Sequence, residues 1–213
     1  MAVLTIIATP IGNLGDISSR GKNALGEMDI ICCEDTRHTG QLLNLLEIPR
    51  KARLVANHEY NENQMANAIV KWLDSGQKGG ICSDAGYPLM SDPGYPAVAA
   101  AIAAGHEIDV IPGASAIPLA IICSGLPPSS YIFKGFAPKK SGQRHGFLEE
   151  DADSRHTMVF YESPLRICSF LEEAMQVFGD RKAAVCLELT KQFQRTIRGN
   201  ISEIIKHFAN ESI

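Results

Sequence analysis

The strongest constraint on the fold is an alternation of short apolar runs with helical patterns along the first half of the chain. Apolar runs rich in β-branched residues predict strands over residues 4–8, 29–33, 53–56, 80–83 and 107–111. Helix caps and apolar residues at helical spacing predict helices over residues 18–27, 40–46, 62–74 and 97–104. Fully apolar strands joined by helices favour a mostly parallel sheet that is covered on both faces.

A second pattern follows the stretch 124–130, which is rich in Pro, Gly and Ser and is the clearest linker candidate. Strands are expected over 131–134, 157–161, 182–189 and 195–198, the last paired with its predecessor, and helices over 143–151, 165–178 and 201–208. We therefore predict an α/β protein of two lobes, residues 1–124 and 125–213, each a mostly parallel or mixed sheet flanked by helices.

Composition limits the partners of the chain. A net charge of -4 provides no wide basic face, so a nucleic-acid partner requires a local patch and the alternative is a small ligand. The 6 cysteines lie mostly in apolar runs without a C-x-x-C pair, which is typical of buried, reduced thiols in a cytosolic protein. The start of the chain lacks the basic region of a signal peptide. No apolar run reaches the roughly 18 residues that cross a bilayer.

Glycine and proline gather directly after three predicted strands, at residues 9–16, 84–94 and 112–116. In open parallel sheets the carboxyl ends of the strands form the ligand crevice, and glycine there lets the backbone approach a ligand. Ordinary turn chemistry explains one such loop, but three at one edge favour a ligand site. The dinucleotide, P-loop and nucleophile-elbow motifs are all absent from the sequence.

Seven segments, in this order, resemble the ribosomal RNA small subunit methyltransferase I family of the tetrapyrrole-methylase superfamily. They are ATPIGNLGDIS at 8–18, EDTR at 34–37, SDAG at 83–86, SDPG at 91–94, IPGASA at 111–116, SGLP at 124–127 and FYESP at 160–164. The resemblance covers essentially the whole chain.

The resemblance implies two α/β lobes that hold S-adenosylmethionine. It implies methyl transfer to the ribose 2′-hydroxyl of a cytidine in the decoding region of small-subunit (16S) rRNA, either as naked rRNA or in the assembled small ribosomal subunit. It also implies a cytoplasmic enzyme, without a membrane partner, that forms a homodimer. The alternatives are a methylase of the same superfamily that acts on a tetrapyrrole and a non-catalytic ribosome-binding module.

The resemblance also implies a set of cofactor-binding residues. They are Pro10, Asp84, Ala85, Gly86, Tyr87, Ser91, Ser115, Ala116, Tyr161 and Thr190. A carboxylate at Asp84 would suit the ribose hydroxyls or the ammonium group of the methionine moiety, and the sequence leaves both open.

Methyl transfer to a ribose hydroxyl requires the removal of one proton, so a base or an alkoxide-stabilising cation is expected. The candidates are Glu34, Asp35, Arg37 and Glu162, with Glu62 as a further acid. The alternative for residues 34–37 is a helix start with acidic residues at its cap.

The densest basic stretch, residues 135–145, is the candidate RNA contact. Lys139, Lys140 and Arg144 supply charge there, and Phe136 is available for stacking. Further candidates are Arg37, Arg166 and Arg195. The alternative is an ordinary solvated loop. No histidine pair has the spacing of a metal site, so no metal is predicted.

The chain departs from the family pattern at two places. The family usually has histidine at the position of Tyr60. Family chains also continue past the position of Ile213 with a further strand and helices, so we expect the second lobe to be truncated.

Overall fold

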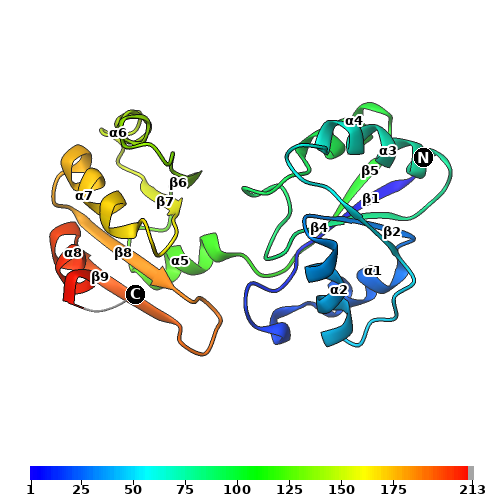
Figure 1. Ribbon diagram of the computed structural model, residues 1–213, viewed down its shortest axis with the longest axis horizontal. Helices are drawn as coiled ribbons and strands as arrows, with labels where there is room; N and C mark the ends of the chain where they lie inside the picture. The colour runs from blue at the N-terminus through cyan, green and yellow to red at the C-terminus, as the bar shows by residue number, and fades with distance from the viewer. Residues whose placement is uncertain (211–213) are drawn as a thin grey trace. The chain divides into compact units, whose positions relative to one another are not determined.

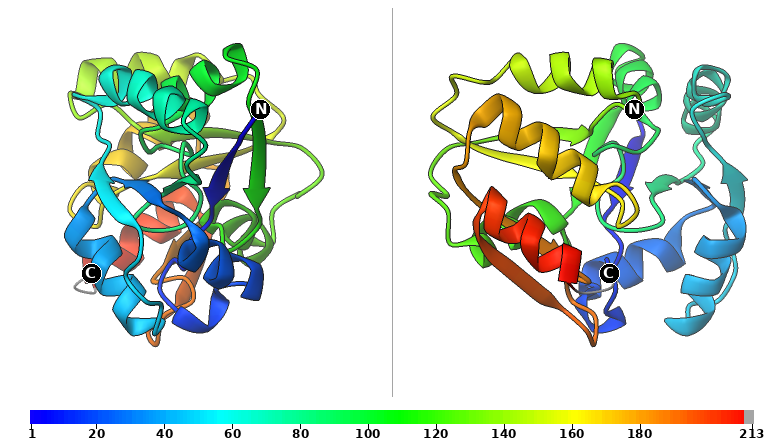
Figure 2. Two further views of the ribbon diagram at one scale, coloured as in Figure 1. Left: turned by 90° about the vertical axis from the view of Figure 1, so that its right-hand side faces the viewer. Right: turned by 60° about the vertical axis from the view of Figure 1, so that its left-hand side comes forward.

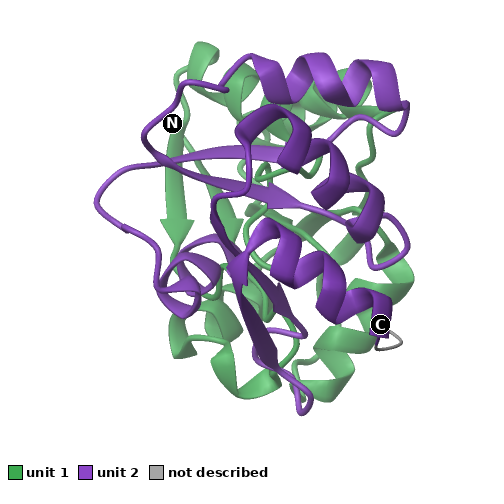
Figure 3. Ribbon diagram, turned by 90° about the vertical axis from the view of Figure 1, so that its left-hand side faces the viewer, with its two compact units in different colours: residues 1–115 green, residues 116–213 purple. Residues whose placement is uncertain are grey.

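The computed structural model describes residues 1–210 of the 213-residue chain. The chain divides into a first unit, Met1–Ser115, and a second unit, Ala116–Ile213, which are coloured separately in Figure 3. Each unit has its own apolar cores and is described by itself. No helix of the described part is long and apolar enough to cross a membrane.

The first unit contains a five-stranded sheet in which every pairing is parallel, with the strand order β3-β2-β4-β1-β5 (Figure 1). The strands are β1 (Val3–Ile7), β2 (Ile30–Cys33), β3 (Arg53–Ala56), β4 (Gly79–Cys82) and β5 (Glu107–Ile111). The helices are α1 (Ser19–Glu27), α2 (Thr36–Leu45), α3 (Glu62–Asp74) and α4 (Tyr95–Ala103), and a short 3-10 helix, η1, spans Leu14–Asp16. The predicted parallel sheet is confirmed.

Both faces of this sheet are buried, as the apolar strands predict. Side chains alternate along each strand, so Ile30 packs with α3 and α4 whereas Ile31 packs with α1 and α2. Figures 1 and 2 show these two helix pairs on opposite sides of the sheet. In the register, Ile7 lies beside Cys82 and Ile111, so β1, β4 and β5 end at one edge.

The second unit contains two separate two-stranded sheets rather than one sheet. The strands β6 (Tyr131–Phe136) and β7 (Thr157–Tyr161) are parallel, whereas β8 (Lys182–Leu187) and β9 (Arg195–Asn200) are antiparallel, so the predicted pairing of the last strand with its predecessor is confirmed. The helices are α5 (Ala116–Ser124), α6 (Ser141–Glu149), α7 (Ile167–Phe178) and α8 (Ile201–Asn210).

The boundary between the units differs from the predicted one at residue 124, because α5 belongs to the second unit. Ile117 and Ile121 of α5 pack against Val159 of β7. This helix was not among those that the sequence pattern predicts. Its segment, AIPLAIICS, is apolar on nearly all sides, so it lacks the polar stripe by which an amphipathic helix is recognised.

Helix α2 begins at Thr36, earlier than the predicted start at residue 40. Asp35 is its N-cap, and the Asp35 side chain accepts a hydrogen bond from the backbone N–H of Arg37. The helix-start alternative for residues 34–37 therefore holds.

Candidate functional site

Hydrogen bonds join the three glycine- and proline-rich loops at the carboxyl edge of the sheet in the first unit. Thr9, after β1, exchanges two backbone hydrogen bonds with Gly86, after β4, at 2.9 and 3.1 Å. The backbone N–H of Gly113, after β5, donates to the Tyr87 hydroxyl at 3.1 Å. These contacts gather the loops into one edge, as their spacing in the sequence predicted.

Two glycines allow this close approach. Gly86 has a φ of +82°, and a Cβ atom there would lie 3.2 Å from Ile11 Cγ2. A Cβ atom on Gly113 would lie 2.9 Å from the Cβ of Ala8, closer than real Cβ atoms approach one another. The backbone at this edge is therefore packed as tightly as glycine permits.

The loop after β4 has an unusual backbone conformation. Leu89 and Ser91 both have a φ of +71°, a left-handed conformation that non-glycine residues rarely adopt. The Glu62 carboxylate accepts a hydrogen bond at 3.3 Å from the backbone N–H of Gly94, which is the N-cap of α4. Glu62, one of the predicted acids, therefore anchors this loop.

Acidic side chains concentrate at the same edge. Asp84 lies 3.2 Å from Nδ1 of His38 and accepts the backbone N–H of Asp35 at 3.4 Å. Burial, together with the charges of Glu34 and Asp84, raises the pKa of Asp92 to about 6. Carboxylates from the ends of β2 and β4 therefore share one electrostatic environment.

Asp35 and Arg37 are engaged with each other. The Arg37 guanidinium donates to both Asp35 carboxylate oxygens, at 3.2 and 2.7 Å, and these hydrogen bonds hold the pKa of Asp35 well below its usual range. A carboxylate that is this weakly basic is a poor proton acceptor. The pair caps α2, and the structure does not support the predicted catalytic role for either residue.

In the second unit, Glu162 follows β7 directly. One of its carboxylate oxygens, Oε1, accepts from the backbone N–H of Ser163 at 2.7 Å and lies 2.5 Å from the Arg166 guanidinium. The other oxygen, Oε2, is buried and has no hydrogen-bond partner among the described residues. Glu162 therefore retains an unused acceptor.

Two predicted cofactor residues of the second unit lie at the ends of strands. Tyr161 ends β7, and its ring packs against Phe133 at 4.9 Å and Phe136 at 5.4 Å between centroids. Thr190, in the loop after β8, has a φ of +67°, and its hydroxyl is buried without a hydrogen-bond partner within residues 1–210. Both residues lie in loops or strand ends that suit a ligand.

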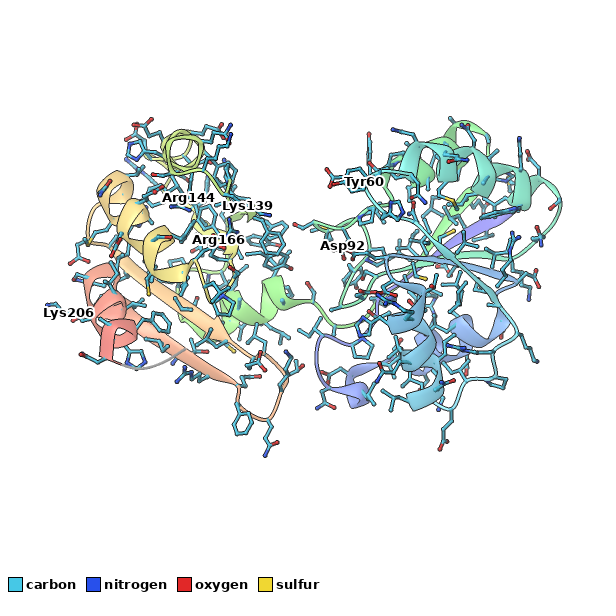
Figure 4. All side chains as sticks on the ribbon, viewed as in Figure 1. Tyr60, Asp92, Lys139, Arg144, Arg166 and Lys206 are labelled. Atoms are coloured by element: carbon cyan, nitrogen blue, oxygen red, sulfur yellow. The ribbon has the colours of Figure 1, made fainter. Side chains whose placement is uncertain are left out.

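The RNA candidates differ in exposure, and Figure 4 labels Lys139, Arg144 and Arg166 among them. Lys139 and Lys140 are exposed, whereas Arg144 is only 5% exposed. The Arg144 guanidinium donates to both carboxylate oxygens of Glu173, at 2.8 and 2.6 Å. Arg144 therefore stabilises the packing of α6 on α7, and it is withdrawn from the predicted RNA contacts.

The structure places the predicted cofactor residues in two groups. Pro10, Asp84, Ala85, Gly86, Tyr87, Ser91 and Ser115 belong to strand-end loops of the first unit, and Ala116, Tyr161 and Thr190 belong to the second unit. Their part in cofactor binding remains a prediction.

Asn57, a buried residue that directly follows β3, is not among the site residues predicted from the sequence. The only signal was its position after a strand, and a single amide there resembles an ordinary turn residue. No group of three or more His, Cys, Asp or Glu side chains within residues 1–210 is arranged to hold a metal ion.

A model of the tetrapyrrole (corrin/porphyrin) methylases matches residues 3–205. The chain is 42% identical over 209 residues to ribosomal RNA small subunit methyltransferase I of Halalkalibacterium halodurans, covering 98% of this chain and 71% of that protein. It is 41% identical over 208 residues to the protein of the same name from Thermotoga maritima, covering 98% and 92%.

Solved structures share the fold at low sequence identity. The methyltransferase CobJ superposes with a TM-score of 0.67 at 18% identity, covering 95% of this chain and 88% of that one. Uroporphyrin-III-C-methyltransferase from Thermus thermophilus superposes with a TM-score of 0.64 at 14% identity, covering 99% and 90%. The family model and the relatives above 40% identity agree with the motif order and the joined loops. The chain therefore belongs to the tetrapyrrole methylase family, among the ribosomal RNA small subunit methyltransferase I proteins.

Proposed function

We propose that this protein methylates small-subunit rRNA with S-adenosylmethionine, at the ribose 2′-hydroxyl of a cytidine in the decoding region. Relatives more than 40% identical are named ribosomal RNA small subunit methyltransferase I, which supports the substrate and the methyl transfer. The ribose position and the base come from the family resemblance. A cytoplasmic location and a homodimer belong to the same proposal.

The observation that carries the proposal is the acidic, closely packed edge of the first unit. S-adenosylmethionine carries a sulfonium and an ammonium group, and an edge with Asp84, Asp92 and Glu34 attracts such cations. The tight backbone at Gly86 and Gly113 suits a ligand held mainly by loop backbone. The residues present therefore fit the cofactor.

Each unit has its own proposed cofactor-binding residues. They are Asp84, Gly86 and Tyr87 in the first unit, and Tyr161 and Thr190 in the second unit. The buried and unpaired hydroxyl of Thr190 is available to a polar group of the ligand. When bound, S-adenosylmethionine supplies the electrophilic methyl group.

The chain must also accept the proton of the ribose hydroxyl. Of the predicted acids, Asp35 and Glu162 are each held by an arginine, whereas Glu34 is exposed at the end of β2. Glu34 is therefore the proposed base, and its position at the strand edge supports this role.

RNA is proposed to contact the exposed loop after β6. Lys139 and Lys140 supply positive charge there, and Phe136, which is 57% exposed, supplies a ring on which a base can stack. This local patch is compatible with a chain whose net charge is -4.

Cofactor binding tests the first part of the proposal. Calorimetry should detect S-adenosylmethionine binding, and Asp84→Ala should weaken it about tenfold, because one charged contact contributes on the order of 1.5 kcal/mol. Asp29→Ala, a change at an acid that binds the backbone N–H of Lys78 instead, is the control and should keep the affinity. An unchanged affinity for Asp84→Ala would remove Asp84 from the site.

Product mapping tests the second part. The protein is incubated with small ribosomal subunits and with naked 16S rRNA, and the methylated nucleoside is located by mass spectrometry. A methyl group on the ribose of a decoding-region cytidine supports the proposal. A methyl group on a base, or transfer to a tetrapyrrole but not to RNA, contradicts it.

A further inference from the structure

The first unit contains a small hollow whose residues Asn57 and Ser83 have no part in the proposed reaction. It lies at the carboxyl ends of three neighbouring strands. Glu34 lines it after β2, Asn57 after β3, and Ser83 and Asp92 from the loop after β4. Because that loop also carries the predicted cofactor residues, the hollow belongs to the same sheet edge.

Asn57 lines this hollow and carries a buried acceptor. The residue is 2% exposed, and its backbone N–H donates to the carbonyl of Cys33 at 2.8 Å, which continues the β2–β3 ladder and holds Asn57 in place. Its side-chain oxygen, Oδ1, has no hydrogen-bond partner in the described part of the chain. Buried polar atoms in folded proteins are nearly always paired, so this oxygen marks a position that a ligand can satisfy.

Asp92 provides a second acceptor. Above pH 6 its carboxyl group is ionised and can only accept hydrogen bonds. The groups that face it are the carboxylates of Glu34 and Asp84 and the hydroxyl of Ser83. That hydroxyl also donates to the Gly86 carbonyl at 3.1 Å, so its single proton has a competing acceptor. The hollow therefore offers negative charge and lone pairs to whatever enters it.

The matching ligand group is a hydrogen-bond donor. As its side chains stand, the hollow has no room for a water-sized group, so a substituent of a base enters it only when the exposed Glu34 side chain moves. In RNA, the amino group of cytosine donates, whereas uracil presents a carbonyl oxygen at the equivalent position.

We propose that Asn57 Oδ1 and the Asp92 carboxylate accept the N–H groups of the exocyclic amino group of the target base and so select cytosine against uracil. The inference rests on the proposed function and adds the residues that read the base. Uracil would place a third acceptor against two others and leave all of them unpaired, which is the type of mismatch that binding sites reject strongly.

Binding of free nucleosides tests the inference without any catalysis. At pH 7.5, addition of cytidine should shift the NMR signal of the Asn57 side-chain amide, and uridine at the same concentration should not. At pH 5, where Asp92 is protonated, the cytidine shift should decrease. Equal shifts with both nucleosides, or none with either, would overturn the inference whether or not the protein methylates RNA.

Substrate discrimination provides the second test. Small subunits with cytidine or uridine at the target position are compared as substrates. Asp92→Asn, which replaces one acceptor oxygen by a donor, should lower kcat/KM for the cytidine substrate roughly ten- to a hundredfold and reduce the preference for cytidine. Asn57→Leu should act in the same direction, and its melting temperature is measured to establish that it folds.

Asp109→Asn is the matched control, since it is the same chemical change on β5 at an acid paired with Arg20, and it should leave the preference unchanged. If the Asn57 and Asp92 variants lower kcat/KM equally for the cytidine and the uridine substrate, the two residues have a merely structural role and the inference is overturned. If the parent protein transfers no methyl group, the proposed function fails, and the nucleoside experiment decides the inference alone.

Discussion

At the scale of the residue, Asp92 links stability to pH. Its pKa of about 6 in the folded protein exceeds the value of roughly 4 in an unfolded chain. Between these values the folded state holds a proton that the unfolded state has lost, so stability falls as pH rises through this window and stays lower above pH 6.

Asp92→Asn removes this penalty. We expect the variant to be more stable than the parent at pH 7.5, by about 1 kcal/mol after allowing for solvent screening, and to match it near pH 4. Urea unfolding at both pH values measures the difference. An equal effect at the two pH values would show that the Asp92 charge is not the cause.

Arg144 illustrates a cation whose role depends on its burial. Arg144→Met leaves the Glu173 carboxylate buried without its partner, and we expect the free energy of unfolding to fall by about 3 kcal/mol. RNA affinity should be unchanged once folding is corrected for. Lys140→Met, at an exposed position, should do the reverse: weaken RNA binding and leave chemical unfolding unaffected.

At the scale of the element, the loop after β4 depends on Gly86. Gly86→Ala places a methyl group at a φ of +82° and 3.2 Å from Ile11. We therefore expect the free energy of unfolding to fall by roughly 1–2 kcal/mol and the binding of S-adenosylmethionine to weaken.

Gly76→Ala is the matched control for this change. Gly76 has a φ of +83° but nothing within 4 Å of the added carbon. Gly76→Ala should lose only the stability that the positive φ costs and should keep its affinity for the cofactor. Thermal unfolding measures the stability, and calorimetry measures the affinity. Equal cofactor affinity in both variants would show that the contact between Thr9 and Gly86 does not shape the site.

Secondary structure was predictable where the local pattern is strong. The helix over 62–74 and the strands over 53–56, 107–111 and 157–161 have the predicted bounds. Helix α5 was missed because an apolar helix and an apolar loop look alike without a polar face. The early start of α2 was missed because its first turn contains no apolar periodicity, although the Asp35 cap was visible in the sequence.

At the scale of the whole molecule, the two units differ in how completely their sheets are paired. The first unit has one five-stranded sheet with a core on each face. The second unit has two two-stranded sheets in the part of the chain that the structure describes. Two-stranded sheets are only marginally stable by themselves.

This difference predicts the behaviour of fragments. A fragment of residues 1–115 should fold alone and unfold cooperatively on heating, because its sheet and both cores are contained within it. A fragment of residues 116–213 should melt at a lower temperature and bind a dye for exposed apolar surface. Circular dichroism measures the melting temperature of each fragment, and dye fluorescence measures its exposed apolar surface. A higher melting temperature for residues 116–213 than for residues 1–115 would contradict this prediction.

The parallel sheet of the first unit, the strand-end loops and the family were predictable from the sequence, because they depend on local patterns and short motifs. Tertiary structure decided which charges are available. In the folded chain Arg144 is hydrogen-bonded to Glu173 and Asp35 to Arg37, whereas the side-chain oxygen of Asn57 is buried and unpaired. The physical reason is that the burial and the partner of a polar side chain come from residues far away in the chain, so identical side chains become an anchor, a cap or a binding group only once the chain has folded.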